Sequence, residues 1–161
     1  MAHDTHDIKQ EFWKALAKSP FLMVKLDDSQ DHALPMTAQL DKQEGPAHGG
    51  AVWFFTDKKN RLAPGGLAMA QFSAKGHDLF ACISGSIVEE KDEALIDSLW
   101  SPQASAWFEG GRQDPSLLAL RFDLDDIEIW TADLGVVGLL KLMTGSKIDP
   151  QQAGEHVQTT V

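Results

Sequence analysis

The spacing of apolar side chains changes from helical to strand-like soon after the N-terminus. Ile8, Phe12 and Leu16 lie four residues apart, which predicts a helix over residues 7–18 with one broad apolar face. The helix is expected to end before Pro20, because proline has no amide hydrogen and restricts the residue that precedes it.

Short apolar and alternating runs follow this helix, and they are typical of β-strands. Six strands are predicted, at residues 21–26, 34–40, 51–56, 67–73, 78–88 and 117–130. They follow one another without the intervening helices that a parallel sheet requires. The pattern therefore predicts a mainly β, antiparallel fold with peripheral helices. Closure or partial closure into a barrel is expected, because it removes exposed strand edges.

The connecting segments contain the remaining predicted elements. Asp92 precedes apolar residues at i,i+4 spacing, which predicts a second helix. A very short helix is expected after Asn60, and residues 101–116 are expected to be irregular. The last strand is expected to kink at Asp125-Asp126, and the tail after Ser146 is expected to be loose.

Charge and length restrict the classes of protein that this chain can represent. Among 161 residues, 24 are acidic and 14 basic, so the net charge is −10. We expect such a chain to repel nucleic acid and anionic membranes. Hydrophobic residues make up 43 %, which is enough for a single domain over residues 1–161. The polar start, the lack of a long apolar run and the single cysteine predict a cytoplasmic location without a signal peptide.

Lys58, Lys59 and Arg61 form a cationic cluster directly after a predicted strand. Amide hydrogens at the start of a helix, together with the guanidinium fork of an arginine, can bind phosphate. Two interpretations remain open at this point. The cluster holds a phosphorylated ligand, or it is a solvated turn that is basic by chance, which sequence statistics alone favour.

Aromatic residues are concentrated in one strand and in the irregular segment. Alternation places Trp53 and Phe55 on one face of a strand and Phe54 on the other. One face is expected to pack in the core, while the other can line a flat ligand or meet a partner. Trp100 and Trp107 lie in or near the irregular segment, where a large apolar side chain needs a cover.

No residue pattern identifies catalytic chemistry directly. The chain has no convincing nucleophilic triad, dinucleotide-binding motif or P-loop, so the catalytic residues are unknown. No metal site is expected, because His3 and His6 belong to a solvated terminus. Cys82 lies in an apolar strand, where a small buried side chain is expected rather than a nucleophile.

Several short motifs occur together in a specific order. They are Pro35-Met36-Thr37-Ala38-Gln39, Trp53-Phe54-Phe55-Thr56, Asn60-Arg61, Ile83-Ser84-Gly85-Ser86, Leu99-Trp100-Ser101-Pro102, Ala106-Trp107-Phe108-Glu109-Gly110-Gly111, Asp114-Pro115 and Glu128-Ile129-Trp130. Through them the chain resembles the pyridoxamine-phosphate-oxidase-like FMN-binding split barrels, and within these the general stress protein 26 group. The resemblance spans Phe12 to Asp133. It implies a six-stranded antiparallel split β-barrel that works as a homodimer, with two FMN molecules in grooves between the subunits.

The resemblance also implies a set of cofactor-binding residues. They are Met36, Thr37 and Gln39 along the flavin ring, Phe55 and Thr56 near the ribityl-phosphate, Asn60 and Arg61 at the phosphate, and Trp107, with Trp100 as a second candidate, over the flavin. The phosphate position agrees with the interpretation of the cationic cluster as an anion site.

Leu34 and Leu62 depart from the family pattern, because members often carry Arg and Lys at these positions. Without these cations, a buried phosphate would lack compensation. Either Lys58, Lys59 or Lys75 substitutes, or FMN binds more weakly, or the ligand differs. Features that bind pyridoxal phosphate are not apparent, so a role in vitamin B6 synthesis is not expected.

Three functions remain open from the sequence. The first is an FMN-dependent oxidoreductase that acts in a stress response with an unidentified redox partner. The second is a stress protein that binds a flavin or another ligand without turnover. The third is a cofactor-free dimeric interaction module, which the leucines at the two cation positions favour slightly.

Overall fold

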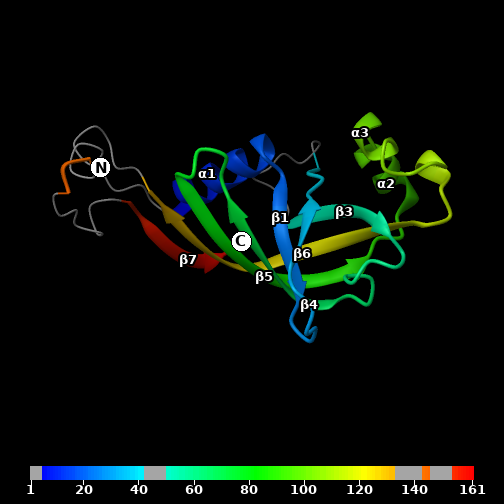
Figure 1. The fold of residues 1–161 in the computed structure, drawn as a ribbon, viewed down its shortest axis with the longest axis horizontal. Coiled ribbons are helices and arrows are strands. Elements are labelled where there is room, and N and C mark those ends of the chain that lie inside the picture. Colours follow the sequence, from blue (N-terminus) through cyan, green and yellow to red (C-terminus); the bar gives the residue numbers. More distant parts are fainter. Residues whose placement is uncertain (1–4, 42–49, 133–142, 146–153) are drawn as a thin grey trace.

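The computed structural model describes residues 5–41, 50–132, 143–145 and 154–161. Its elements are α1 (Thr5–Lys18), β1 (Phe21–Leu26), β2 (Leu34–Thr37), β3 (Ala51–Asp57), β4 (Gly66–Ser73), β5 (Leu79–Glu89), α2 (Glu93–Leu99), α3 (Pro102–Ser105), the 3₁₀ helix η1 (Gly111–Gln113), β6 (Leu117–Thr131) and β7 (His156–Thr160). Figure 1 shows a strongly curved sheet with α1 toward one end and α2 and α3 at the other. The predicted mainly β architecture with peripheral helices is confirmed.

The strands form one antiparallel sheet in the order β2-β1-β4-β5-β6-β3, and β7 pairs with β6 beside β3. The two ends of this path, β2 and β3, meet at an isolated bridge between Gln39 and Trp53. Within the described ranges the barrel is thus joined there at one residue pair rather than along a ladder. This is the six-stranded split barrel that the sequence predicts.

Helix α1 covers the interior of the barrel with its apolar stripe. Ile8, Phe12 and Leu16 are at most 2 % exposed, and Phe12 meets Phe72 of β4 edge to face at 5.8 Å. The helix begins at Thr5, slightly before the predicted start. Among the residues described, no helix combines the length and apolar character needed to cross a membrane.

The kink expected in the last strand is a β-bulge. The register between β5 and β6 changes between Ser84 and Gly85, and the pairing skips Asp125. A Cβ atom on Gly85 would lie 2.1 Å from the carbonyl oxygen of Asp123. Glycine is therefore required here, because the two main chains approach too closely for any side chain.

Three connecting segments differ from expectation. Residues 58–64 form turns instead of a short helix. The side chain of Asn60 accepts a hydrogen bond from the amide of Leu62, and this bond competes with helical hydrogen bonding. The segment 101–116, expected to be irregular, contains α3 and η1. The hydroxyl of Ser101 accepts the amide of Ala104, which caps α3.

The C-terminal tail is the third difference. Residues 156–160, expected to be loose, form β7 and pair with residues 126–130 of β6. This part of β6 lies beyond the end of β3, so its edge is free to accept another strand. The rest of the expected tail, residues 146–153, lies outside the described residues.

Candidate functional site

Arg61 is exposed and lies in the turn between β3 and β4. The chain has three arginines. Arg112 and Arg121 are each held by two carboxylates, whereas Arg61 donates a hydrogen bond from Nη1 to the main-chain carbonyl of His32 at 2.7 Å. A guanidinium has five N–H donors, so within the part of the chain that the structure describes Arg61 retains donors and a charge without a carboxylate partner, which fit an anion such as phosphate.

Asn60 brings three segments of the chain together beside Arg61. Its Nδ2 donates to Oγ1 of Thr56 at 2.8 Å and lies 3.9 Å from Sδ of Met36. Its Oδ1 accepts the amide of Leu62 at 2.8 Å. The end of β3, strand β2 and the turn are therefore connected through one side chain. Four predicted site residues, Met36, Thr56, Asn60 and Arg61, belong to this group.

The amide groups at the start of this turn already donate hydrogen bonds, and that of Lys58 donates to the carbonyl of Ser116 at 3.0 Å. The amide of Lys59 donates to Oδ1 of Asp57, and the amide of Asn60 donates to the carbonyl of Asp57. The expected contribution of a helix N-terminus to anion binding is therefore wrong. Any anion affinity depends on the side chain of Arg61 and on the exposed Lys58 and Lys59.

The two leucines at the family's cation positions serve the core. Leu62 is fully buried in the hydrophobic core, and Leu34 is half-buried against it. An apolar side chain at these positions stabilises the barrel rather than facing solvent. The neighbouring Arg61 is exposed, and Asn60 is half-buried at the edge of this core. The two positions therefore lack the positive charge that family members often carry, and they contribute buried apolar surface instead.

The remaining ring-binding candidates lie along β2. Thr37 is exposed, and Gln39 is half-buried where it pairs with Trp53. The amide of Gln39 donates to the carbonyl of Trp53 at 2.7 Å, and the amide of Trp53 donates back at 3.0 Å. The segment from Met36 to Gln39 therefore runs beside β3, close to the group around Asn60.

Two aromatic candidates lie apart from the Asn60 group. Phe55 packs against Trp100 with ring centroids 5.1 Å apart, and Trp100 packs against Phe108 at 5.9 Å. Phe54, on the opposite face of β3, is fully buried, as the alternation predicts. Trp107 is 84 % exposed near the end of α3. The structure thus places Phe55 in an aromatic cluster under α2 and α3, and leaves Trp107 on the surface.

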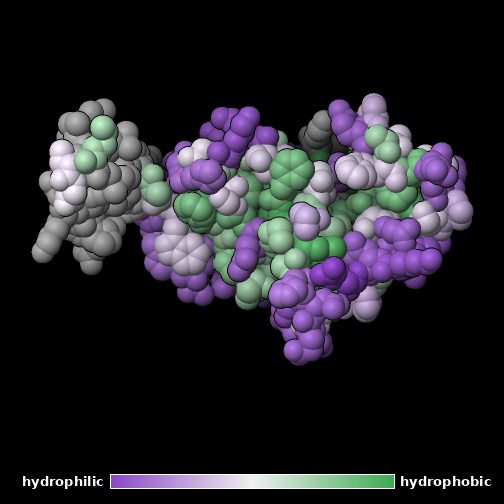
Figure 2. All heavy atoms as spheres, in the orientation of Figure 1, coloured by the Kyte–Doolittle hydropathy of each residue, from purple (hydrophilic) through white to green (hydrophobic). Residues whose placement is uncertain are grey.

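The outer face of the sheet carries apolar residues that the sequence reasoning did not single out. Six of them, 39 % to 66 % exposed, are Phe21, Met23, Leu67, Met69, Phe80 and Trp130. Figure 2 shows apolar side chains gathered over the middle of the face, above β1 and β5. The sequence does indicate such a face, since both odd-numbered and even-numbered positions of β1 and β4 carry apolar residues. An exposed apolar surface of this kind is typical of an interface.

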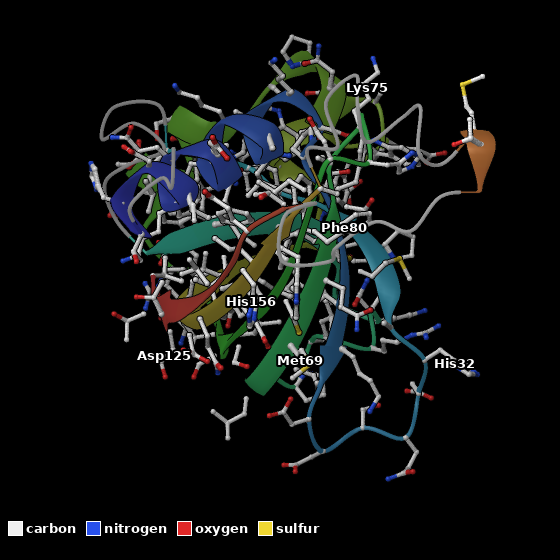
Figure 3. The ribbon with its side chains drawn as sticks, turned by 90° about the vertical axis from the view of Figure 1, so that its left-hand side faces the viewer. His32, Met69, Lys75, Phe80, Asp125 and His156 are labelled. Carbon is white, nitrogen blue, oxygen red and sulfur yellow. The ribbon has the colours of Figure 1, made fainter. Side chains whose placement is uncertain are left out.

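Polar residues border this outer face on β6 and β7. Nε2 of His156 lies 2.6 Å from Oε1 of Glu128, and the imidazole stacks on Trp130 at 5.2 Å. Figure 3 shows His156, Phe80 and Met69 along the strands, and His32 in the loop between β1 and β2. Burial, and secondarily the carboxylate of Glu128, raises the pKa of the Cys82 thiol. The raised pKa keeps the thiol protonated, but the side chain is half-buried, so the expectation of a buried cysteine is wrong.

Comparison with solved structures identifies close relatives. A general stress family protein from Xanthomonas campestris pv. campestris is 45 % identical, with a TM-score of 0.72, over 81 % of this chain and 90 % of that chain. The general stress FMN/FAD binding protein from Xanthomonas citri is 46 % identical, with a TM-score of 0.71, over 79 % and 90 % of the two chains. General stress protein 26 from Jannaschia sp. CCS1 is 28 % identical, with a TM-score of 0.77, over 98 % and 100 %.

Comparison with curated proteins gives no match. Comparison with protein families agrees with the structural likenesses. The family described as pyridoxamine 5'-phosphate oxidase like matches residues 7–153, which includes every strand of the six-stranded barrel. The resemblance noted from the motifs is thereby confirmed. The chain belongs to the pyridoxamine 5'-phosphate oxidase-like family.

Proposed function

We propose that this protein binds FMN and acts as an FMN-dependent oxidoreductase in a stress response. The observation that carries the proposal is the environment of Arg61, an exposed arginine without a carboxylate partner among the described residues, beside an asparagine that connects β2 and β3. This arrangement fits a phosphate monoester attached to a flat ring system. The similarity to the FMN/FAD binding protein of Xanthomonas citri supports a flavin as that ring system.

The residues of this chain would divide the work as follows. Arg61 and Asn60 bind the phosphate, with Lys58 and Lys59 adding positive charge. Thr56 and Phe55 lie near the ribityl chain. The flavin ring lies along Met36, Thr37 and Gln39. Trp107 is available at the surface to cover the flavin. When bound, the flavin supplies the electron-transfer chemistry, while the protein supplies position and electrostatics.

We further propose that two copies of the chain form a homodimer through the outer face of the sheet, with the flavin in a groove between them. Six exposed apolar residues on this face support the proposal, because removing them from water favours association. The acidic net charge would oppose association at low salt. An apolar contact is therefore expected at the centre of the interface, with charged groups at its edge.

The test of cofactor binding is the visible spectrum and fluorescence of the purified protein titrated with FMN and, in parallel, FAD. Micromolar binding of FMN with quenched flavin fluorescence is expected. Arg61→Ala should weaken it about tenfold or more, because a charge-assisted hydrogen bond is lost. Lys14→Ala is the control, since Lys14 is exposed on α1 and outside the site. A wild-type protein that binds neither flavin overturns the proposal.

Turnover separates the oxidoreductase from a flavin carrier. The loaded protein is mixed with NADH or NADPH in a stopped-flow instrument, and bleaching of the flavin band is followed. Reduction faster than that of free FMN supports an enzyme. Binding with a rate equal to that of free FMN would instead support a non-catalytic flavin-binding stress protein.

A further inference from the structure

A buried carboxylate lies close to the candidate site and has no role in the function proposed so far. Within the described ranges Glu90 is the one charged residue that is buried, and its side chain is 7 % exposed. Its Oε1 accepts a hydrogen bond from Nε1 of Trp53 at 3.2 Å, and its Oε2 accepts one from Nη1 of Arg121 at 3.2 Å. Such a buried charge is tolerated because it is paired and hydrogen-bonded.

Glu90 follows β5 directly, and its partners lie on two other strands. Trp53 is on β3 and Arg121 is on β6, where the two residues are paired in register. Arg121 is itself fixed by Oδ1 of Asp123 at 2.9 Å. The carboxylate therefore holds the indole of Trp53 in one orientation against β6.

Trp53 connects this carboxylate to the region of β2. Its side chain binds Glu90, while its main-chain amide and carbonyl both pair with Gln39, at 3.0 Å and 2.7 Å. This pair is the isolated bridge at which the two ends of the barrel meet. One residue therefore links the buried carboxylate to the point where the barrel is split.

The bridge is part of the region proposed to bind FMN, because Gln39 is one of the proposed ring-binding residues. Gln39 continues the segment that begins at Met36, and Trp53 precedes Thr56 on the same strand. A full ladder would fix the separation of two strands through many hydrogen bonds, whereas an isolated bridge fixes it through two. Trp53 is also paired with Arg121 in the ladder to β6, so the separation of the two strands beside Gln39 depends on how firmly that ladder and Glu90 together hold Trp53.

The geometry points to Glu90 as a positioning residue of the flavin site. It acts through Trp53 and Gln39 and sets the spacing between β2 and β3 that FMN requires, without touching the cofactor itself. This inference rests on the proposed FMN site, because it concerns the width of that site. It assigns to the Glu90, Trp53 and Arg121 network a role in affinity as well as in folding.

The experiment uses two variants that weaken the same contact from opposite sides. Trp53→Phe removes the N–H donor and keeps an apolar ring, and Glu90→Gln removes the charge and keeps the shape. Glu93→Gln is the matched control, because Glu93 also pairs with an arginine, Arg112, but on α2. FMN affinity is measured by fluorescence titration, and amide hydrogen exchange at Gln39 and Trp53 is measured in the cofactor-free protein.

We expect both variants to bind FMN about tenfold more weakly, as for the loss of one hydrogen bond to a charged group. Exchange of the two bridge amides should be faster, and Glu93→Gln should match the wild type in both measurements. The double variant should lose little more than the worse single variant, because both act through one contact.

Each other outcome has a defined meaning. Variants that melt at lower temperature but bind FMN with wild-type affinity show a merely structural role and overturn the inference alone. A wild-type protein that does not bind FMN overturns the proposed function, and the inference with it. If Glu90→Gln does not fold, Trp53→Phe decides, because it leaves the pair of Glu90 and Arg121 intact.

Discussion

The side-chain amide of Asn60 donates a hydrogen bond of 2.8 Å to the hydroxyl of Thr56, so the turn after β3 is fixed to the strand that precedes it. The carbonyl of the same amide accepts the main-chain N–H of Leu62. One side chain thus determines both the shape of the turn and the direction in which Arg61 leaves it. The proposed phosphate site depends on this local geometry more than on the number of cations nearby.

Replacing Asn60 is therefore expected to affect stability and ligand binding together. Asn60→Ala removes two hydrogen bonds and should lower the free energy of unfolding by about 1 to 2 kcal/mol. It should also weaken FMN binding, because Arg61 is no longer held. Chemical denaturation and flavin titration measure the two effects. Thr56→Ser keeps the hydroxyl and should resemble the wild type, and equal losses in both variants would contradict this explanation.

Gly85→Ala is expected to destabilise the barrel strongly. The new Cβ would meet the carbonyl oxygen of Asp123 at 2.1 Å and the ring of Phe122 at 2.7 Å, so the bulge must open. A cost of about 3 kcal/mol, at the upper end for overpacking, is expected in urea unfolding. Gly76→Ala is the control, because its Cβ would meet only Asp78 at 3.4 Å or more. Equal stability of the two variants would show that the bulge adapts freely.

The pKa of Cys82 predicts slow modification and a specific dependence of stability on pH. The raised pKa keeps the thiol protonated near neutral pH, so alkylation should be slower than that of a free cysteine. Above the ordinary thiol pKa the unfolded chain loses this proton before the folded chain does. The folded state then binds more protons, so stability falls as pH rises through that window. Glu128→Gln removes the secondary cause and should speed alkylation, which mass spectrometry can follow.

The proposed dimer predicts that one charge on the outer face will separate the subunits. Met69→Lys places an ammonium among the exposed apolar residues, and burying it without a partner is costly. Light scattering after gel filtration should show a monomer for this variant and a dimer for the wild type. Lys14→Ala, on α1, should remain dimeric. A wild-type monomer at high micromolar concentration would contradict the proposed interface.

Strand β7 is expected to be held mainly by its main-chain pairing. His156→Ala removes the contact with Glu128 and the stack on Trp130, but both side chains of the ion pair are partly exposed. The loss in stability should therefore stay near 1 kcal/mol or below. A change in tryptophan fluorescence is expected, since the stacked imidazole is gone. Complete loss of hydrogen-exchange protection in residues 126–130 would instead show that the side chain of His156 contributes more than the main-chain pairing to holding β7.

The strands could be predicted from the sequence because one face of each is buried. Leu34, Met36 and Ala38 alternate with polar residues, and the structure buries that parity of β2. The turn after β3 could be predicted, but the very short helix expected after Asn60 is wrong, because the hydrogen bond from the amide of Leu62 to the side chain of Asn60 competes with helical hydrogen bonding.

The candidate site was predictable in composition but not in its decisive property. Asn60 and Arg61 were identified from sequence, yet only the fold shows that Arg112 and Arg121 are paired with carboxylates, three of which lie 15 or more residues away in the chain. The role of Leu62 as a core residue was hidden for the same reason. Likewise β7 pairs with a strand that precedes it by about 30 positions in its register, a nonlocal contact that local propensity does not encode.

Asp125, the residue that the pairing of β6 skips, reverses the alternation of inward-facing and outward-facing side chains along the strand. Before Asp125, even-numbered residues such as Phe122 and Leu124 point into the core; after it, odd-numbered residues such as Ile127 and Ile129 do. A regular alternation through position 125 would turn Trp130 and its even-numbered neighbours inward and the isoleucines outward. A deletion at position 125 is therefore expected to remove the bulge while Ile127 and Ile129 stay inside and Trp130 stays outside.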